Sequence, residues 1–234
     1  KGGSEEGGRY LLRCPRPANA GARLKADARR VLLDGVCQGL DGYEGTPPEL
    51  LERLLATKLD LIAFTHSHRD HFLDSFVREY LRRWPGTPVA GPADLVQALA
   101  PYPVTKEPVN LGDLQIRPVA TRHIGAAFRT VPHFSFVLRT SGACLWFTGD
   151  AAPTQRVSPE ALPRPDVLLA PFAYAATEAG WRAAELTGAK ELVLLHMPRR
   201  VKDPAGLWPA VEAVLSRRDT ISVRIPAMGE TLLL

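Results

Sequence analysis

The sequence predicts a mixed α/β (α+β) fold in which two sheets pack together and helices cover them from outside. Strand-like apolar runs alternate with helical patterns over residues 46–99 and again over residues 167–225, and a β-rich stretch lies between them. Helices at both ends of such a chain can cover the outer faces of two sheets. With 234 residues, of which 45% are hydrophobic, the chain is long enough for one sizeable core.

The first half of the chain predicts short strands followed by an α/β stretch. Residues 10–12 and 22–25 are expected to form edge strands and 30–34 a central strand. The segment Thr46-Pro47-Pro48-Glu49 predicts a capping box that opens a helix to about Thr57. The apolar run Leu59–Thr65 predicts a buried strand, and further elements are expected at 74–84 (helix), 88–90 (strand) and 93–99 (helix).

The second half predicts a β-rich centre and a second α/β stretch. Strands are expected at 114–119, 134–139 and 143–148, the last two joined by a hairpin turn at residues 140–142. A strand at 167–170, a helix near 177–187 and a strand at 192–195 follow. A helix that starts at Pro204 and a strand at 221–225 are expected to complete the fold.

Composition predicts a single domain over residues 9–234. Residues 1–8 are rich in Gly and Glu and are interpreted as a disordered tail or a remnant of protein expression. The three cysteines are unclustered, which favours reduced thiols and a cytoplasmic location. The net charge is only +4 and the arginines are scattered, so a nucleic-acid partner is not indicated; nor does any apolar run approach the length of a membrane span.

The motif His66-Ser67-His68-Arg69-Asp70-His71 carries the clearest chemical signal. It holds three imidazoles and one carboxylate directly after the predicted strand Leu59–Thr65. Side chains two residues apart in extended chain project to the same side, so His66 and His68 can bind one metal ion while Asp70 and His71 bind a second. Imidazole and carboxylate ligands suit zinc first, and iron or manganese as alternatives.

A two-metal site needs further ligands, and single polar residues follow three other predicted strands. They are His123, Asp150 and His196. Reactive groups in α/β folds collect where strands end, so these residues are candidate ligands. His133 precedes a strand, and it could replace His123 as the third ligand of the first metal or instead contact the substrate.

The order of these residues resembles the pattern of the metallo-β-lactamase superfamily, THxHxDH followed by a distant His, a Gly-Asp pair and a C-terminal His. Thr65 to His71, His123, Gly149-Asp150 and His196 match in order, and Val31 to Gly35 resembles the family's early strand ending in Asp. The resemblance implies a four-layer αββα sandwich. It also implies that His66, His68 and His123 bind one metal, that Asp70, His71 and His196 bind the other, that Asp150 bridges them, and that Asp34 is a buried carboxylate behind the ligands.

These features predict a metal-dependent hydrolase with two zinc ions per chain. A metal-bridging hydroxide would attack a small ester, thioester, lactone or phosphodiester, with Asp70 orienting the nucleophile and His133 contacting a leaving group or oxyanion. A phosphodiesterase or nuclease, and a non-catalytic metal-binding module, are the alternatives. Tyr43, Phe128 and Tyr174 are candidate walls for a small-molecule substrate, and no oligomeric state is predicted.

Overall fold

The computed structural model describes residues 10–13, 21–26, 28–40, 42–43, 45–153, 162–226 and 230–233. The tail predicted at residues 1–8 lies outside these ranges, so that prediction stays untested. Thirteen strands and five α-helices are assigned within the described residues, together with two short 3₁₀ helices, η1 (Ala126–Phe128) and η2 (Phe172–Tyr174).

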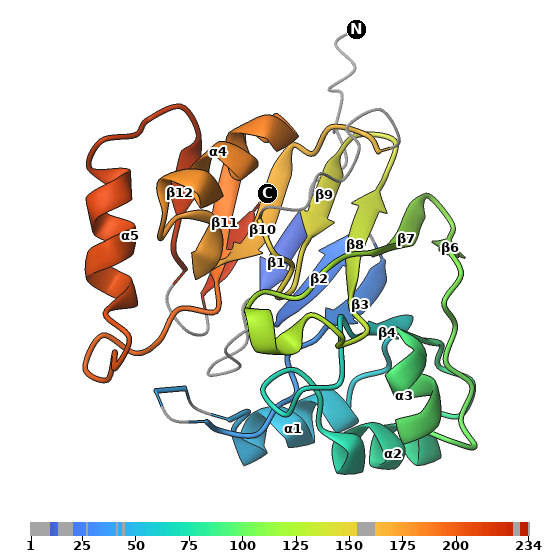
Figure 1. Cartoon of the computed structure of the whole chain (residues 1–234). Helices are drawn as coiled ribbons and strands as arrows, with labels where there is room; N and C mark the ends of the chain where they lie inside the picture. Colours follow the sequence, from blue (N-terminus) through green and yellow to red (C-terminus); the bar gives the residue numbers. More distant parts are fainter. Residues whose placement is uncertain are drawn as a thin grey trace, which may run out of the picture.

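The strands form two sheets that lie against each other (Figure 1). The first sheet has the order β13-β1-β2-β3-β4-β5. Its strands are β1 (Tyr10–Arg13), β2 (Ala22–Ala26), β3 (Arg29–Leu33), β4 (Leu61–Ala63), β5 (Val89–Ala90) and β13 (Thr231–Leu233). The second sheet has the order β12-β11-β10-β9-β8-β7-β6. Its strands are β6 (Val109–Leu111), β7 (Leu114–Ala120), β8 (Phe134–Arg139), β9 (Cys144–Phe147), β10 (Val167–Pro171), β11 (Glu191–Leu195) and β12 (Ser222–Arg224).

Each sheet combines an antiparallel half with a parallel half. In the first sheet β3, β4 and β5 run parallel, and in the second sheet β9, β10, β11 and β12 run parallel. Parallel neighbours end at the same edge of a sheet, and the loops after them therefore come together there. This arrangement brings residues that are far apart in the sequence to one edge of the sandwich.

Three apolar clusters show that the fold has four layers. The first lies between the sheets and includes Leu33, Phe136 and Leu169, all fully buried. The second packs helices α1 (Pro48–Leu55), α2 (Asp74–Arg83) and α3 (Ala93–Ala98) on the outer face of the first sheet. The third packs α4 (Glu178–Thr187) and α5 (Leu207–Leu215) on the second sheet, as Figure 1 shows. The predicted αββα sandwich is confirmed.

Two helices begin differently from the prediction. Thr46 forms no capping box, because its hydroxyl accepts a hydrogen bond from the Cys37 amide at 3.0 Å, and Pro48 is the first residue of α1. The helix expected to start at Pro204 begins instead at Leu207. The Asp203 carboxylate accepts hydrogen bonds from the amides of Leu207 and Trp208 at 2.9 and 2.8 Å, which satisfies the free amides of the first turn.

None of the helices within the described residues combines the length and the apolar character that crossing a lipid bilayer would require.

Candidate metal centre

The candidate ligands, and the Asp34 carboxylate behind them, lie after the ends of strands. Asp34 follows β3, the His66–His71 motif follows β4, and His196 follows β11. Asp150 comes three residues after the end of β9, and His123 three residues after the end of β7. The backbone bridge between His123 and Ala151 joins the last two loops directly. The seven ligands predicted from the sequence therefore meet at one edge of the sandwich.

These seven residues form two groups, each with ligand atoms within 4.8 Å of one another. The first group is His66, His68 and His123, and the second is Asp70, His71, Asp150 and His196. In the first group the Nε2 atoms of His66 and His123 are 3.3 Å apart. In the second group Oδ2 of Asp70 lies 3.3 Å from Nε2 of His196.

One oxygen atom of Asp150 lies between the two groups. Its Oδ2 is 3.4 Å from Nε2 of His71, 3.6 Å from Nε2 of His196 and 3.7 Å from Nε2 of His123. His123 belongs to the first group, whereas His71 and His196 belong to the second. A carboxylate in this position can serve both groups.

The spacing of these ligand atoms matches that of ligands around a transition-metal ion. Zinc–nitrogen bonds of about 2.0–2.1 Å place neighbouring ligands of a tetrahedral site about 3.3–3.4 Å apart, close to the separations found here. Nε2 of His71 and Oδ1 of Asp150 are buried and form no hydrogen bond with any described residue. Buried polar atoms without partners are unfavourable, and a bound cation would satisfy them.

Hydrogen bonds behind the ligands orient three of the imidazoles. Nδ1 of His71 lies 2.8 Å from Oδ2 of Asp34, and Nδ1 of His123 lies 2.6 Å from the carbonyl oxygen of Ile124. The Thr65 hydroxyl donates to Asp34 at 2.8 Å, so it can only accept from Nδ1 of His66, 2.9 Å away. Each Nδ1 is thus the donor, and each Nε2 faces the site as metal-binding histidines require.

The local charges favour neutral imidazoles at His66 and His68 and ionised carboxylates at Asp70 and Asp150. Burial and the neighbouring His71 lower the pKa of His66 well below its ordinary value, and burial likewise lowers the pKa of His68, so both imidazoles are neutral. Burial opposes ionisation of Asp150, but His196 and His71 outweigh it and hold the pKa of Asp150 well below its usual range. Burial acts against Asp70 in the same way, and the hydrogen bond from His196 lowers the pKa of Asp70 overall.

Unusual backbone conformations occur beside these ligands. Asp34 and His196 have φ values of 50° and 56°, in the left-handed region that non-glycine residues seldom adopt. Gly149 has φ 53°, and a Cβ atom there would lie 2.4 Å from a methyl carbon of Thr65. Only glycine lets the Asp150 loop approach the Thr65 side chain so closely.

His133 lies beside the ligands but outside both groups. The sequence left it open as an alternative to His123; in the structure His123, and not His133, shares a group with His66 and His68. The His133 ring is 5.1 Å from the His66 ring and 5.6 Å from the His123 ring, measured between centroids. Its Nδ1 lies 2.8 Å from the Thr121 hydroxyl.

Aromatic side chains surround the ligands. The Tyr43 ring lies 5.1 Å from the ring of His196, and the Phe128 ring lies 5.1 Å from His68 and 5.2 Å from His123. Phe172, which the sequence analysis missed because it follows a strand without any polar signal, lies 6.0 Å from His196. Tyr174, predicted as a third aromatic wall of the substrate site, is instead buried and lines a separate cavity on the outer face of the second sheet.

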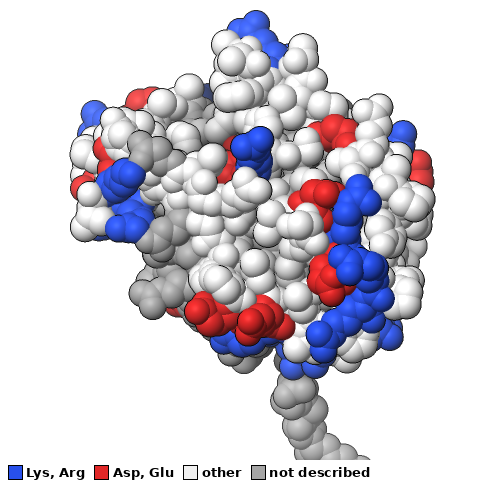
Figure 2. Space-filling model, turned by 90° about the horizontal axis from the view of Figure 1, so that it is seen from below, with Lys and Arg blue, Asp and Glu red and all other residues white. Residues whose placement is uncertain are grey.

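Positive charge does not form a continuous band across the face seen from below. Figure 2 shows Lys and Arg in several groups with Asp and Glu beside them. Arg82 of α2 pairs with Glu79 at 2.6 Å, and Arg200 pairs with Glu212 of α5 at 2.7 Å. Arg82 lies on α2 and Arg200 in the loop before α5, and these two helices lie apart in Figure 1. The two ion pairs give no indication of a nucleic-acid clamp.

The family model for the beta-lactamase superfamily domain matches residues 29–197, which include all seven candidate ligands. The chain belongs to this superfamily. The prediction of a metal-dependent hydrolase is therefore confirmed at the level of the superfamily and its fold. No significant match was found among curated protein sequences.

Solved structures of this superfamily fold are similar over almost the whole chain. Igni18, a metallo hydrolase from the archaeon Ignicoccus hospitalis, is 20% identical with a TM-score of 0.68, covering 97% of this chain and 98% of its own. The metallo-beta-lactamase fold protein YhfI from Bacillus subtilis is 18% identical with a TM-score of 0.67, covering 97% and 99%. CmlA, a diiron beta-hydroxylase from Streptomyces venezuelae, is 14% identical with a TM-score of 0.63, covering 97% of this chain and 54% of CmlA.

Proposed function

We propose that this chain is a dinuclear, zinc-preferring hydrolase that cleaves a small ester, thioester, lactone or phosphodiester. The observation that carries the proposal is the position of Asp150, whose Oδ2 lies 3.7 Å or less from imidazole nitrogens of both ligand groups. When bound, two such ions supply a water molecule of lowered pKa as nucleophile and polarise the substrate oxygen. His66, His68 and His123 would hold one ion, and Asp70, His71 and His196 the other, with Asp150 shared.

The residues of the chain supply orientation and charge. Asp34 holds His71, and Thr65 holds His66, so that the ligand nitrogens face the site before any ion binds. Asp70 is ionised and 14% exposed, so it can accept a hydrogen bond from the attacking water and orient it. Zinc is preferred because imidazole nitrogens outnumber carboxylates among the ligands; the diiron protein CmlA has a similar fold, and iron and manganese remain the alternatives.

The surroundings favour a small substrate. Phe128 is 45% exposed and lies against the rings of His68 and His123, where it can contact an apolar group of a bound molecule. The paired arginines support neither a nuclease nor a phosphodiesterase acting on nucleic acid. A cytoplasmic location stays a prediction, in keeping with two free, buried cysteines, Cys37 and Cys144.

The test is a hydrolysis panel on the full chain reconstituted with zinc, iron or manganese. The substrates are a generic phosphodiester, a thioester, a lactone and a cephalosporin. We expect turnover of at least one substrate, highest with zinc, lost on chelation and reduced at least about a hundredfold in Asp150→Asn. Asp113→Asn, which changes an exposed carboxylate that accepts hydrogen bonds from the hairpin residue Ser141, is the matched control. A fully metallated protein that hydrolyses none of these substrates would favour the non-catalytic module.

A further inference from the structure

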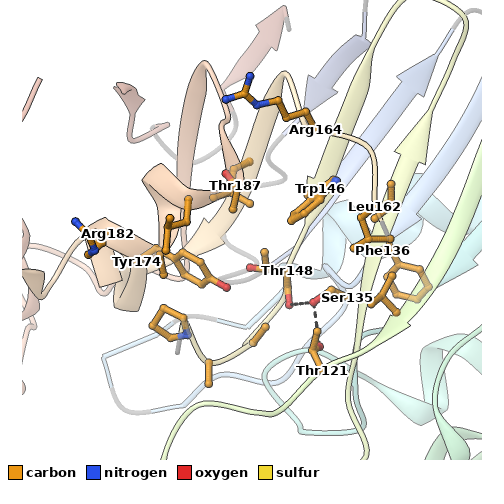
Figure 3. Close-up of a pocket in the computed structure, with 18 of the residues that line it drawn as sticks. Thr121, Ser135, Phe136, Trp146, Thr148, Leu162, Arg164, Tyr174, Arg182 and Thr187 are labelled. Carbon is orange, nitrogen blue, oxygen red and sulfur yellow. Dashed lines mark hydrogen bonds between the residues drawn. The ribbon is translucent and has the colours of Figure 1, made fainter. Parts of the chain in front are cut away.

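Three hydrogen-bonding contacts join His133 to the second sheet. Nδ1 of His133 lies 2.8 Å from the Thr121 hydroxyl, which lies 3.0 Å from the Ser135 hydroxyl, which in turn lies 3.0 Å from the carbonyl oxygen of Thr148. Thr121, Ser135 and Thr148 also line a cavity of about 590 Å³ on the outer face of the sheet. Figure 3 shows the last two contacts as dashed lines at the wall of this cavity.

The donor in each of these three hydrogen bonds follows from counting the available protons. The Thr148 carbonyl oxygen can only accept, so Ser135 donates its one hydroxyl proton to it. Ser135 then has no proton for Thr121, and Thr121 must donate to Ser135. Thr121 therefore has no proton for His133, and Nδ1 of His133 must itself be the donor. In a neutral imidazole the other nitrogen, Nε2, then carries a lone pair and no proton.

The surroundings of His133 keep its Nε2 unprotonated and, within the described part of the chain, without a hydrogen-bond partner. The side chain is only 3% exposed, and burial to this extent favours the neutral imidazole over the charged one. Nε2 points away from Thr121, has no hydrogen-bond partner among the described residues, and belongs to a ring adjacent to His66 and His123. A buried acceptor without a partner favours any bound group that can donate to it.

We propose that the hydrogen bonds running from His133 through the Thr121 and Ser135 hydroxyls to the Thr148 carbonyl oxygen lock His133 in the Nδ1–H tautomer and so make its Nε2 a hydrogen-bond acceptor beside the His66 group. The role of this acceptor rests on the proposed function: it accepts from an O–H or N–H group of a molecule bound at the metal centre. The site then selects ligands that carry a donor at this point. This differs from the sequence-based expectation of contact with an oxyanion, because a neutral Nδ1–H imidazole has no proton to donate from Nε2.

The tautomer is measured by two-bond ¹⁵N–¹H correlation spectra of the zinc-reconstituted chain labelled at histidine, with the His133 signals assigned by their loss in His133→Gln. We expect a protonated Nδ1 and an unprotonated Nε2. Ser135→Ala frees the Thr121 hydroxyl proton to donate to Nδ1, so the tautomer ratio should move toward Nε2–H by about tenfold, the scale of one net hydrogen bond. Ser135→Thr, which keeps the hydroxyl, should restore the wild-type pattern, and Ser141→Ala on the exposed hairpin should leave it unchanged.

The acceptor role is measured in the same spectra with acetohydroxamate, which carries N–H and O–H donors, and acetate, which carries none. We expect the Nε2 resonance of His133 to move with acetohydroxamate and not with acetate. A protonated Nε2 in the wild-type chain, or the same tautomer ratio in Ser135→Ala, would overturn the lock; bound acetohydroxamate without a change at Nε2 would overturn the acceptor. None of these readouts needs turnover, so a chain that hydrolyses nothing would contradict the proposed function and leave this inference standing.

Discussion

Nδ1 of His71 lies 2.8 Å from Oδ2 of Asp34, and both side chains are fully buried. Asp34 also accepts hydrogen bonds from the Thr65 amide at 2.7 Å and from the Thr65 hydroxyl at 2.8 Å. One carboxylate thereby aligns His71 directly and His66 through Thr65. The two histidines belong to different ligand groups, so Asp34 links the orientation of both halves of the centre.

Asp34→Asn should weaken metal binding without removing a ligand. The asparagine amide keeps the size of the carboxylate but loses its charge. Its NH₂ group would also donate toward Thr65 or His71, which themselves donate to Asp34. We expect zinc affinity to fall about 10- to 100-fold and the free energy of unfolding to fall by about 1–3 kcal/mol. Titration against a competing chelator and chemical denaturation measure the two effects. Unchanged zinc affinity would show that Asp34 has only a structural role.

Gly149→Ala should disturb the centre through Thr65. The new methyl group would lie 2.4 Å from a carbon of Thr65, and the residue would keep a strained φ of 53°. Gly86→Ala is the matched control, because its φ of 85° is also positive but its Cβ meets nothing within 4 Å. We expect the free energy of unfolding to fall by about 1 kcal/mol in Gly86→Ala. In Gly149→Ala it should fall further, and zinc binding should weaken. Equal losses in both variants would contradict the role given to the close approach.

Comparing His123→Ala with His133→Ala should show which of these two histidines is a metal ligand. Nε2 of His123 lies 3.3 Å from Nε2 of His66, whereas His133 lies outside both ligand groups. Elemental analysis after zinc reconstitution should show that His123→Ala loses the ion of the first group and that His133→Ala keeps its metal. The reverse result would make His133 the third ligand.

Cys144 should resist alkylation in the folded protein. It is 7% exposed, and burial together with Asp166 raises the pKa of its thiol to about 11, so the reactive thiolate is scarce at pH 8. Iodoacetamide treatment at pH 8 followed by peptide mass spectrometry should leave Cys144 unmodified in the native chain and modify it in urea. Rapid labelling of native Cys144 would contradict its burial in β9.

The fold, and the gathering of the candidate ligands at one edge of it, could be predicted because both depend on residue type and order. Polar residues after uncharged strands marked His123, Asp150 and His196. The contacts behind the ligands depend on strand register instead, which the sequence does not display. Asp34 and His71 are 37 residues apart, and Thr121 and Ser135 meet because Val119 pairs with Ser135 across β7 and β8. The start of α5 was mispredicted for a related reason. The helix begins at Leu207, after Pro204, because the Asp203 carboxylate accepts hydrogen bonds from the amides of Leu207 and Trp208.

Native mass spectrometry of the zinc-reconstituted chain can count the bound metal ions and so show whether two of them share Asp150. We expect two zinc ions in the wild-type chain, and one tightly bound ion in Asp150→Asn, because the neutral amide no longer offsets the repulsion between two cations. Thermal melting should show that the variant stays folded, and Asp113→Asn should bind two ions like the wild type. A wild-type chain that binds one ion or none, or an Asp150→Asn chain that binds two as tightly as the wild type, would contradict the dinuclear account.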